Sequence, residues 1–359
     1  MFGRIYCGEL KKIVRPKAMI VLSVVLLIVL IAYAIFYNFV GTVTKMVVDS
    51  VEGEEAQEFI PVSVLQQDYT FNEENVNAGI AMTEAEIQEL EERYKTEKTG
   101  YNVYPSLFSA KARLTALKYV RDNKLYGEDT RVLGVNYTIG GLSLTADGFA
   151  SDYMSVVVAV MAIYAVVIGA GLLADEMKNG TIKLLLTRPI TKNQLLTAKF
   201  LAALTVSLGI AALFTLIGFV YGAIAFPVEA TKPIYLVFNG TSVFRSTVGG
   251  YLFGTFVMSL VRIATMCLIA YFLGTIARKK TTGIIVTIII HLGIVSAILG
   301  LLPVQIALLS PNMGLMNYFS PASSVPIYGN FFISLAVYVA YVAAITFGLY
   351  FSVNKRDVI

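Results

Sequence analysis

The sequence predicts an all-α polytopic membrane protein with six transmembrane helices, both termini in the cytoplasm and an α-rich external domain between spans one and two. Two observations carry this prediction. Hydrophobic residues make up 57% of the 359 residues and charged residues only 14%, whereas about a quarter are charged in ordinary soluble domains. The apolar residues also gather in long runs, and a helix of about 20 such residues crosses the hydrocarbon of a bilayer.

Six runs are long enough to span. Five carry no charged residue inside their boundaries, apart from Lys199 at the edge of the third, and the fourth carries Arg262 near its middle. The first run is well beyond the roughly 7–15 apolar residues of a signal peptide, so we expect a retained anchor. The expected spans are 18–40, 153–174, 199–226, 246–277, 282–302 and 331–353.

Loop charge predicts the orientation. The side that would hold both termini carries fifteen Lys and Arg residues against four Asp and Glu residues, whereas segment 41–152 carries ten against nineteen. Because cytoplasmic loops are enriched in Lys and Arg, we expect the termini, the loop 175–198 and the tail 354–359 inside, and 41–152 outside.

The external segment 41–152 is predicted to be α-rich. Thr83 and Glu86 have the spacing of a capping box, and the helix that they would start can run to Gly100. A second helical pattern follows Pro105, and residues 131–141 could form a strand. The segment is either a spacer and packing cap or a site that recognises a ligand or partner.

The loop between the second and third spans predicts a short, stiff helix. Gly180 is a poor helix residue and a good stop, and Thr181 after it is a suitable N-cap. Ile182, Leu185 and Leu186 then follow at i, i+3 and i+4, which places them on one apolar ridge.

Two further signals delimit this helix. Pro189 disfavours helix at Arg188 and stops the ridge after about two turns. Thr191 and Gln194 have the spacing of a capping box at the start of the third span. The helix either lies among lipid headgroups or docks its ridge into a groove on a soluble partner, and the physical pattern favours neither.

The N-terminal segment 1–17 predicts an amphipathic helix on the inner membrane surface. Lys11 and Lys12 lie off its apolar face, and Pro16 precedes the first span. The apolar face consists of Phe2, Ile5, Tyr6, Leu10, Ile13 and Val14.

The loop resembles the cytoplasmic loop of ABC-2 type transporter permeases. Those proteins carry a Glu, then Gly-Thr, then several leucines, and then a Pro that precedes a Ser or Thr and a basic residue. Here that order is followed by Glu176, Gly180–Thr181, Leu184–Leu186 and Arg188–Thr191. The charged ending NKRDVI and the six-span layout also resemble the family. The large insert after the first span departs from its shortest members, which leaves the sub-family and the substrate open.

The resemblance implies that residues from about Lys178 to Pro189 form a coupling helix in a cleft of a separate ATP-binding subunit, with Glu176 securing the loop. Segment 1–17 would be the connecting helix beside that ATPase, or a simple lipid anchor, or both. The residues to which the resemblance assigns a role in ATPase coupling are Glu176, Lys178, Gly180, Thr181, Ile182, Leu185, Leu186, Arg188 and Pro189.

The expected function is that of the permease subunit of an ABC-2 type exporter in a bacterial cell membrane. Six spans form half a pathway, so we expect a second permease, the same or a related chain, and two copies of the ATPase, with membrane lipid around them and no nucleic acid. Few charged residues line the spans, which favours an amphiphilic or hydrophobic cargo such as a peptide antibiotic, a lipid-like molecule or a drug. The alternative is a membrane sensor that reads a ligand through its external domain and signals through a cytoplasmic partner.

No enzyme site is predicted in this chain. It contains no G-x-x-x-x-G-K-[ST] loop for nucleotide phosphates and no H-E-x-x-H metal motif, and no serine has a convincing partner beyond the lone His291. We expect no catalytic, cofactor-binding or metal-binding residues, and the resemblance implies that ATP and Mg²⁺ bind to the partner ATPase.

Arg262 is the most informative single residue. A central arginine costs about 2.5–3.5 kcal/mol on insertion scales, so its side chain should face protein or water. No Asp or Glu lies within any predicted span to pair with it. Arg262 either lies in the translocation path or binds an anionic lipid or substrate group, or else backbone carbonyls at a helix break satisfy it. His291 is expected to be a packing hydrogen-bonder rather than a ligand.

Segment 303–330 is apolar, but its four prolines exclude one continuous helix. Irregular backbone at membrane depth is tolerated only inside protein or beside water. We therefore expect short re-entrant helices at the outer face, which resembles the outer gate of ABC-2 permeases.

Overall fold

The computed structural model describes most of the helical part of the chain. The described residues are 2–14, 16–50, 72–96, 104–126, 130–131, 146–182, 191–226, 234–238, 242–292, 331–355 and the single residues 294, 309, 313 and 315. Five helices in these ranges are long and apolar enough to cross a membrane. They are α2 (Pro16–Ser50), α7 (Ala146–Lys178), α9 (Lys192–Ala225), α10 (Val248–Ala277) and α14 (Phe331–Lys355).

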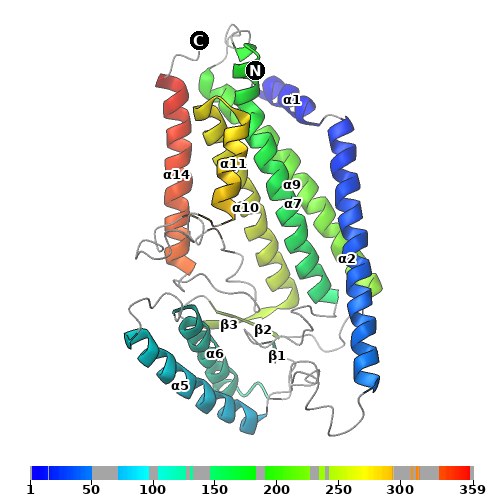
Figure 1. Cartoon of the computed structure of the whole chain (residues 1–359), viewed down its shortest axis with the longest axis vertical. Helices are drawn as coiled ribbons and strands as arrows, with labels where there is room; N and C mark the ends of the chain where they lie inside the picture. The colour runs from blue at the N-terminus through cyan, green and yellow to red at the C-terminus, as the bar shows by residue number, and fades with distance from the viewer. Residues whose placement is uncertain are drawn as a thin grey trace.

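These helices stand side by side in one bundle, and both chain termini lie at the same end of it (Figure 1). We call this end the N/C end. The short helix α1 (Phe2–Ile13) lies there, across the start of α9. The arrangement is that of a multi-pass membrane protein, and the predicted spans 18–40, 153–174, 199–226, 246–277 and 331–353 each fall on one of its long helices.

The predicted span 282–302 is described only in its first half. There the chain forms α11 (Lys280–His291), an apolar helix of 12 residues that packs beside α10 and α7. Residues 295–302 lie outside the described residues, so the sixth span stays a prediction.

The centre of the bundle is α7, which packs against α9, α10 and α11. Small residues bring α7 and α10 into close contact. A Cβ atom on Gly169 would lie 2.5 Å from the carbonyl oxygen of Cys267, and one on Gly274 would overlap the carbonyl group of Ala170. A Cβ on Gly283 of α11 would in turn lie 2.8 Å from the nitrogen of Gly274. Backbone packing of this kind needs glycine, because membrane helices associate through close contact of small residues.

Helix α2 joins the bundle along one seam. Its buried residues recur every three or four positions, as one helix face requires, while the opposite face leaves large apolar side chains such as Ile28 and Ile35 exposed. An exposed apolar face on a spanning helix suits contact with lipid. The seam consists of Leu22, Leu26, Leu30, Ala34 and Tyr37.

At the end of the bundle opposite the N/C end lies a small α/β unit (Figure 1). Helices α5 (Glu73–Thr96) and α6 (Tyr104–Asp122) pack against each other and against a three-stranded sheet. In the sheet, β1 (Thr130–Arg131) pairs in parallel with β2 (Ile234–Phe238), which pairs antiparallel with β3 (Val243–Thr247).

Two expectations for this unit need correction. The all-α class holds for the bundle, but this unit also contains a sheet. The hairpin of that sheet, β2 and β3, comes from the segment between α9 and α10, so the unit is not confined to 41–152. Leu236 of β2 is fully buried against Val76 and Leu117, which ties the hairpin to both helices. The second error is the capping box. Helix α5 begins at Glu73, ten residues earlier, and the Thr83 hydroxyl donates to the Gly79 carbonyl inside it.

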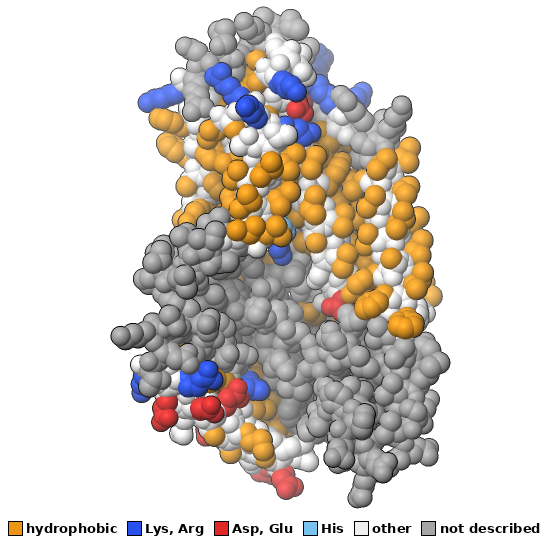
Figure 2. Space-filling model, in the orientation of Figure 1, with side chains coloured by type: hydrophobic (Ala, Val, Ile, Leu, Met, Phe, Trp, Pro, Cys, Tyr) orange, Lys and Arg blue, Asp and Glu red, His pale blue; other side chains and the backbone are white. Residues whose placement is uncertain are grey.

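Charge is distributed unevenly along the bundle axis. Basic side chains gather at the N/C end, an apolar band follows, and acidic side chains mix with basic ones on α5 and α6 at the far end (Figure 2). This spatial distribution is what the positive-inside tendency produces when the N/C end is cytoplasmic.

Candidate functional site

The candidate site is the base of the loop that joins α7 to α9 at the N/C end. Helix α7 ends at Lys178, whose side chain is exposed, and the Gly180 amide donates to the Met177 carbonyl at 3.3 Å. Gly180 has a φ of +68°, in the left-handed region that favours glycine. The predicted helix stop at this residue is confirmed.

Beyond Gly180 the loop is fastened to the bundle. The Thr181 hydroxyl donates to the Glu176 carbonyl at 3.4 Å, so its described contact closes the end of α7. Ile182 is 5% exposed and belongs to the main apolar core, together with Leu173 and Leu196. Among the predicted coupling residues, Leu185, Leu186, Arg188 and Pro189 lie outside the described residues.

The loop re-enters the bundle through a capping box, as predicted. The Gln194 amide donates to the Thr191 hydroxyl at 3.2 Å, and the Thr191 amide donates to the Gln194 side-chain oxygen at 3.4 Å. Together these bonds satisfy two backbone donors that a helix start otherwise leaves unpaired. Both ends of the loop are therefore fixed to rigid helices.

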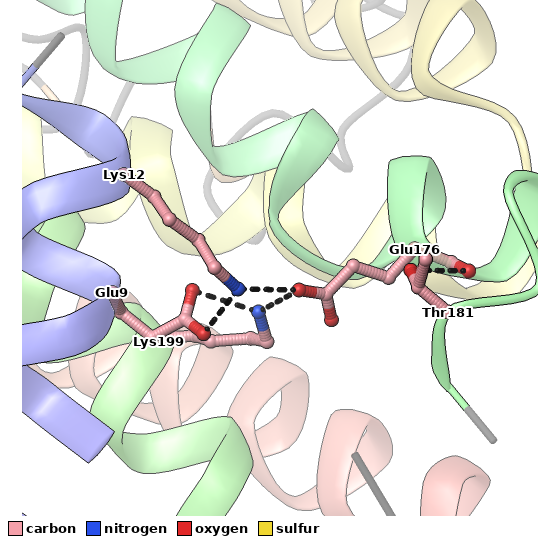
Figure 3. Close-up of polar contacts among 5 residues, drawn as sticks. All are labelled: Glu9, Lys12, Glu176, Thr181 and Lys199. Carbon is pink, nitrogen blue, oxygen red and sulfur yellow. Dashed lines mark hydrogen bonds and ion pairs between the residues drawn. The ribbon is translucent and has the colours of Figure 1, made fainter. Parts of the chain in front are cut away.

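Four charged side chains meet beneath the loop, and we call them the charged junction: Glu9, Lys12, Glu176 and Lys199 (Figure 3). The Lys199 ammonium is 1% exposed and lies 2.9 Å from Glu9 Oε2 and 2.6 Å from Glu176 Oε1. Lys12 lies 2.8 Å from Glu9 Oε1 and 3.2 Å from Glu176 Oε1. Two cations and two carboxylates thus alternate and neutralise each other.

The junction connects three helices. Glu9 and Lys12 come from one face of α1, Glu176 from the last turn of α7 and Lys199 from the second turn of α9. Residues 176 and 199 flank the loop, so the contact between them closes the loop at its base. The Tyr6 hydroxyl, 2.8 Å from that of Thr205, holds α1 to the outer side of α9.

The charged forms are favoured in the junction. Burial alone would raise the pKa of the Glu9 carboxyl, but Lys199 and Lys12 outweigh it, and this pKa lies below its ordinary value. Burial alone would lower the pKa of Lys12, but Glu9 and Glu176 raise it above its ordinary value. The stabilisation is therefore lost as pH falls through the lowered pKa of Glu9 or rises through the raised pKa of Lys12.

The sequence alone does not predict this junction. The family resemblance indicates a role for Glu176, and the helical pattern of segment 1–17 places Lys12 off the apolar face, but neither pattern links Glu9 to Lys199. A local signal exists for Lys199. Its neighbours at i−3 and i+3, Leu196 and Ala202, are both buried, so a helical pattern places the ammonium on the core face.

The other predicted residues lie deeper in the bundle. Arg262 lies on α10 with its Nε buried and without a hydrogen-bond partner in the described ranges. From segment 303–330 the structure describes Leu309, Met313 and Leu315, and all three are buried against residues of α7, α10 and α14. The rest of this segment lies outside the described residues, so the re-entrant helices stay a prediction.

The fold and this junction define a multi-pass membrane protein with a fastened loop at its basic end. The chain belongs to the ABC-2 family of transporter proteins, because the family model, described as "ABC-2 family transporter protein", matches residues 4–346. Members of this family are membrane components of transport and work with a separate ATP-binding subunit.

A curated relative is much less informative. The chain is similar to an uncharacterized protein, YhcI, of Bacillus subtilis (strain 168), with 26% identity over 124 residues. That match covers 34% of this chain and 40% of the relative, so the chain spans less than half of the relative's length. No solved structure matches the chain.

Proposed function

We propose that this chain is the permease subunit of an ABC-2 type exporter, and that the loop between α7 and α9 docks on a separate ATP-binding subunit. The observation that carries this proposal is the charged junction. It ties the two ends of the loop to each other and to α1, so a push on the loop reaches α7 and α9 together rather than bending a flexible connection.

The position of the loop supports the docking role. It leaves the basic end of the bundle, which we assign to the cytoplasm where ATP is available. Ile182, the first residue of the predicted apolar ridge, is buried in the permease core, whereas Leu185 and Leu186 continue the ridge in sequence. We propose that these two leucines, with Arg188 and Pro189 after them, enter a groove on the ATPase.

The transport path follows from this assignment. Two copies of this chain, or this chain and a related permease, form the path, and two ATPases bind beneath them. Closure of the ATPases on ATP pushes both loops and opens the path to the outside. The unit of α5, α6 and the sheet then lies on the outer side, and the spans suit an amphiphilic or hydrophobic cargo.

Replacing both ridge leucines, Leu185→Glu with Leu186→Glu, is expected to abolish the association with the ATPase, because two carboxylates cannot enter an apolar groove without a large desolvation penalty. The measurement is purification of the tagged full chain from its native host in mild detergent, with mass spectrometry of the proteins that co-purify. We expect a P-loop ATPase with the unmodified chain and at least a tenfold smaller amount with the double variant.

Met82→Glu is the matched control, because Met82 is 74% exposed on α5, at the opposite end of the molecule. It should retain the ATPase, and size-exclusion profiles should show that both variants are folded. If the unmodified chain brings down no ATPase under several gentle conditions, the exporter proposal is wrong, and the membrane sensor becomes the better hypothesis.

A further inference from the structure

Arg262 is a cation in the middle of α10, and it forms no ion pair with any of the described residues. It is the fifteenth of the 30 residues of α10, far from either end of the helix. Its Nε is buried and has no hydrogen-bond partner within the part of the chain that the structure describes. A charged guanidinium at this depth of a membrane costs free energy, and such a charge is usually paired. Its surroundings should therefore contain an anion.

The sequence excludes a large part of the chain as a source of that anion. No Asp or Glu occurs between residues 230 and 356, a stretch that includes α10, α11, α14 and the connection between the last two. Helix α9 contains none either. A second copy of the chain would bring the same spans and therefore no carboxylate at this depth.

The carboxylates of α7 lie at other levels. The hydroxyls of Ser151 and Tyr251 are 2.8 Å apart, which places Asp152 beside the start of α10. Tyr251 precedes Arg262 by eleven residues, or about 16 Å of helix, and Asp152 accepts a hydrogen bond from Tyr37. At the N/C end, Asp175 pairs with Lys280, and Glu176 belongs to the charged junction.

His291 supplies a second unpartnered group beside the arginine. It is the last residue of α11, and its Nδ1 is buried without a hydrogen-bond partner among the described residues. Helices α10 and α11 run antiparallel with Gly283 against Gly274, so His291, eight residues further along α11, lies level with residue 266 of α10, about one helical turn from Arg262. Neighbouring hydroxyls are already used, because Thr265 donates to the Val261 carbonyl at 3.0 Å and Thr287 to the Gly283 carbonyl at 2.7 Å.

We propose that Arg262 and His291 form a site for the oxyanion headgroup, a phosphate or a carboxylate, of an amphiphile that lies in the membrane. The planar guanidinium matches such groups with two parallel hydrogen bonds, and imidazole adds one more. Helix α10 carries no other charged residue, and α11 carries none besides Lys280, which suits the hydrocarbon part of the ligand. This inference rests on the proposed function. It narrows the class of the cargo, or of a bound lipid, to anionic amphiphiles.

Dodecyl phosphate is the probe. The full chain is purified without ATPase in a neutral maltoside detergent, immobilised, and titrated with the radiolabelled probe. We expect saturable binding to the unmodified chain and about tenfold weaker binding to Arg262→Gln, which removes charge-assisted hydrogen bonds. Arg262→Lys keeps the charge and should bind with intermediate affinity, and it also shows that a change at this position is tolerated by the fold.

Arg245→Gln is the matched control, because Arg245 is an exposed arginine in β3, outside the proposed site. It should bind the probe as tightly as the unmodified chain. Equal affinity of Arg262→Gln and the unmodified chain overturns the proposal, and so does equally tight binding of dodecyltrimethylammonium, which has the same tail and a cationic headgroup.

Two sources of the headgroup are distinguished by extracting the lipids that co-purify. A resident phospholipid is present in the unmodified chain, is displaced by dodecyl phosphate and is lost from Arg262→Gln. A transported amphiphile leaves the site free of phospholipid, and the probe binds without displacing any. The variant with Leu185→Glu and Leu186→Glu should bind the probe normally, so failure of the anion site and failure of the ATPase docking are separate results.

Discussion

Replacing Lys199 with methionine is expected to lower the free energy of unfolding by about 3–5 kcal/mol, the cost of breaking a buried ion pair by removing one partner. Methionine is similar in length and adds no polar group, so the loss is electrostatic. Glu9 and Glu176, whose side chains are 7% and 15% exposed, would face each other with only the half-exposed Lys12 between them. Unfolding of the purified chain in mixed micelles with sodium dodecyl sulfate measures the change.

Neutralising the carboxylates provides the control. Lys199→Met combined with Glu9→Gln and Glu176→Gln removes the buried charges altogether and should recover most of the lost stability. Lys12→Met should cost much less, because the Lys12 side chain is 50% exposed and exposed ion pairs contribute about 0–1 kcal/mol. A Lys199→Met chain within about 1 kcal/mol of the unmodified chain would show that the junction does not hold the loop.

Gly274→Val is expected to prevent normal packing of α7, α10 and α11. The new Cβ would overlap the backbone carbonyl of Ala170 on α7. Gly283 of α11 also packs closely against Gly274, so α11 leaves no free space there either. Backbone atoms cannot turn aside as a side chain can, so the cost should reach or exceed the roughly 1–3 kcal/mol typical of overpacked cores. The yield of monodisperse chain and its unfolding free energy measure the effect.

Gly209→Val is the matched substitution. Gly209 also lies inside a spanning helix, α9, but nothing lies within 4 Å of the position of its Cβ. The same change of residue should therefore leave yield and stability close to those of the unmodified chain. If both valine variants behave alike, the close contact between α7 and α10 is not what orders the bundle.

Five of the spans and the ends of the loop were predictable because their causes are local. A charge-free apolar run of about 20 residues predicts a spanning helix wherever it occurs, and Gly180 and the Thr191–Gln194 box act on their own helix ends. The capping box at Thr83 failed for a related reason. Its motif is short, and Thr83 equally well bonds back to Gly79 within a helix that has already begun.

The charged junction and the sheet were not predictable in the same way. Lys199 and Glu9 are 190 residues apart, and β1 pairs with a hairpin that begins about 100 residues later. No periodic pattern in one sequence reports such pairings. For Arg262 the sequence did show the absence of a carboxylate in the spans, but only the register of α7 against α10 shows how far Asp152 lies from it.

The most direct test of the proposed loop docking is photo-crosslinking in the native host. A photoreactive p-benzoylphenylalanine replaces Leu186, and the same residue at Met82, on the opposite end of the molecule, serves as the control. We expect irradiation to join position 186, and not position 82, to a protein that carries a P-loop. Adducts from position 186 that contain only lipid or this chain itself, in cells that make the partner ATPase, would contradict the proposal that the loop docks on the ATPase.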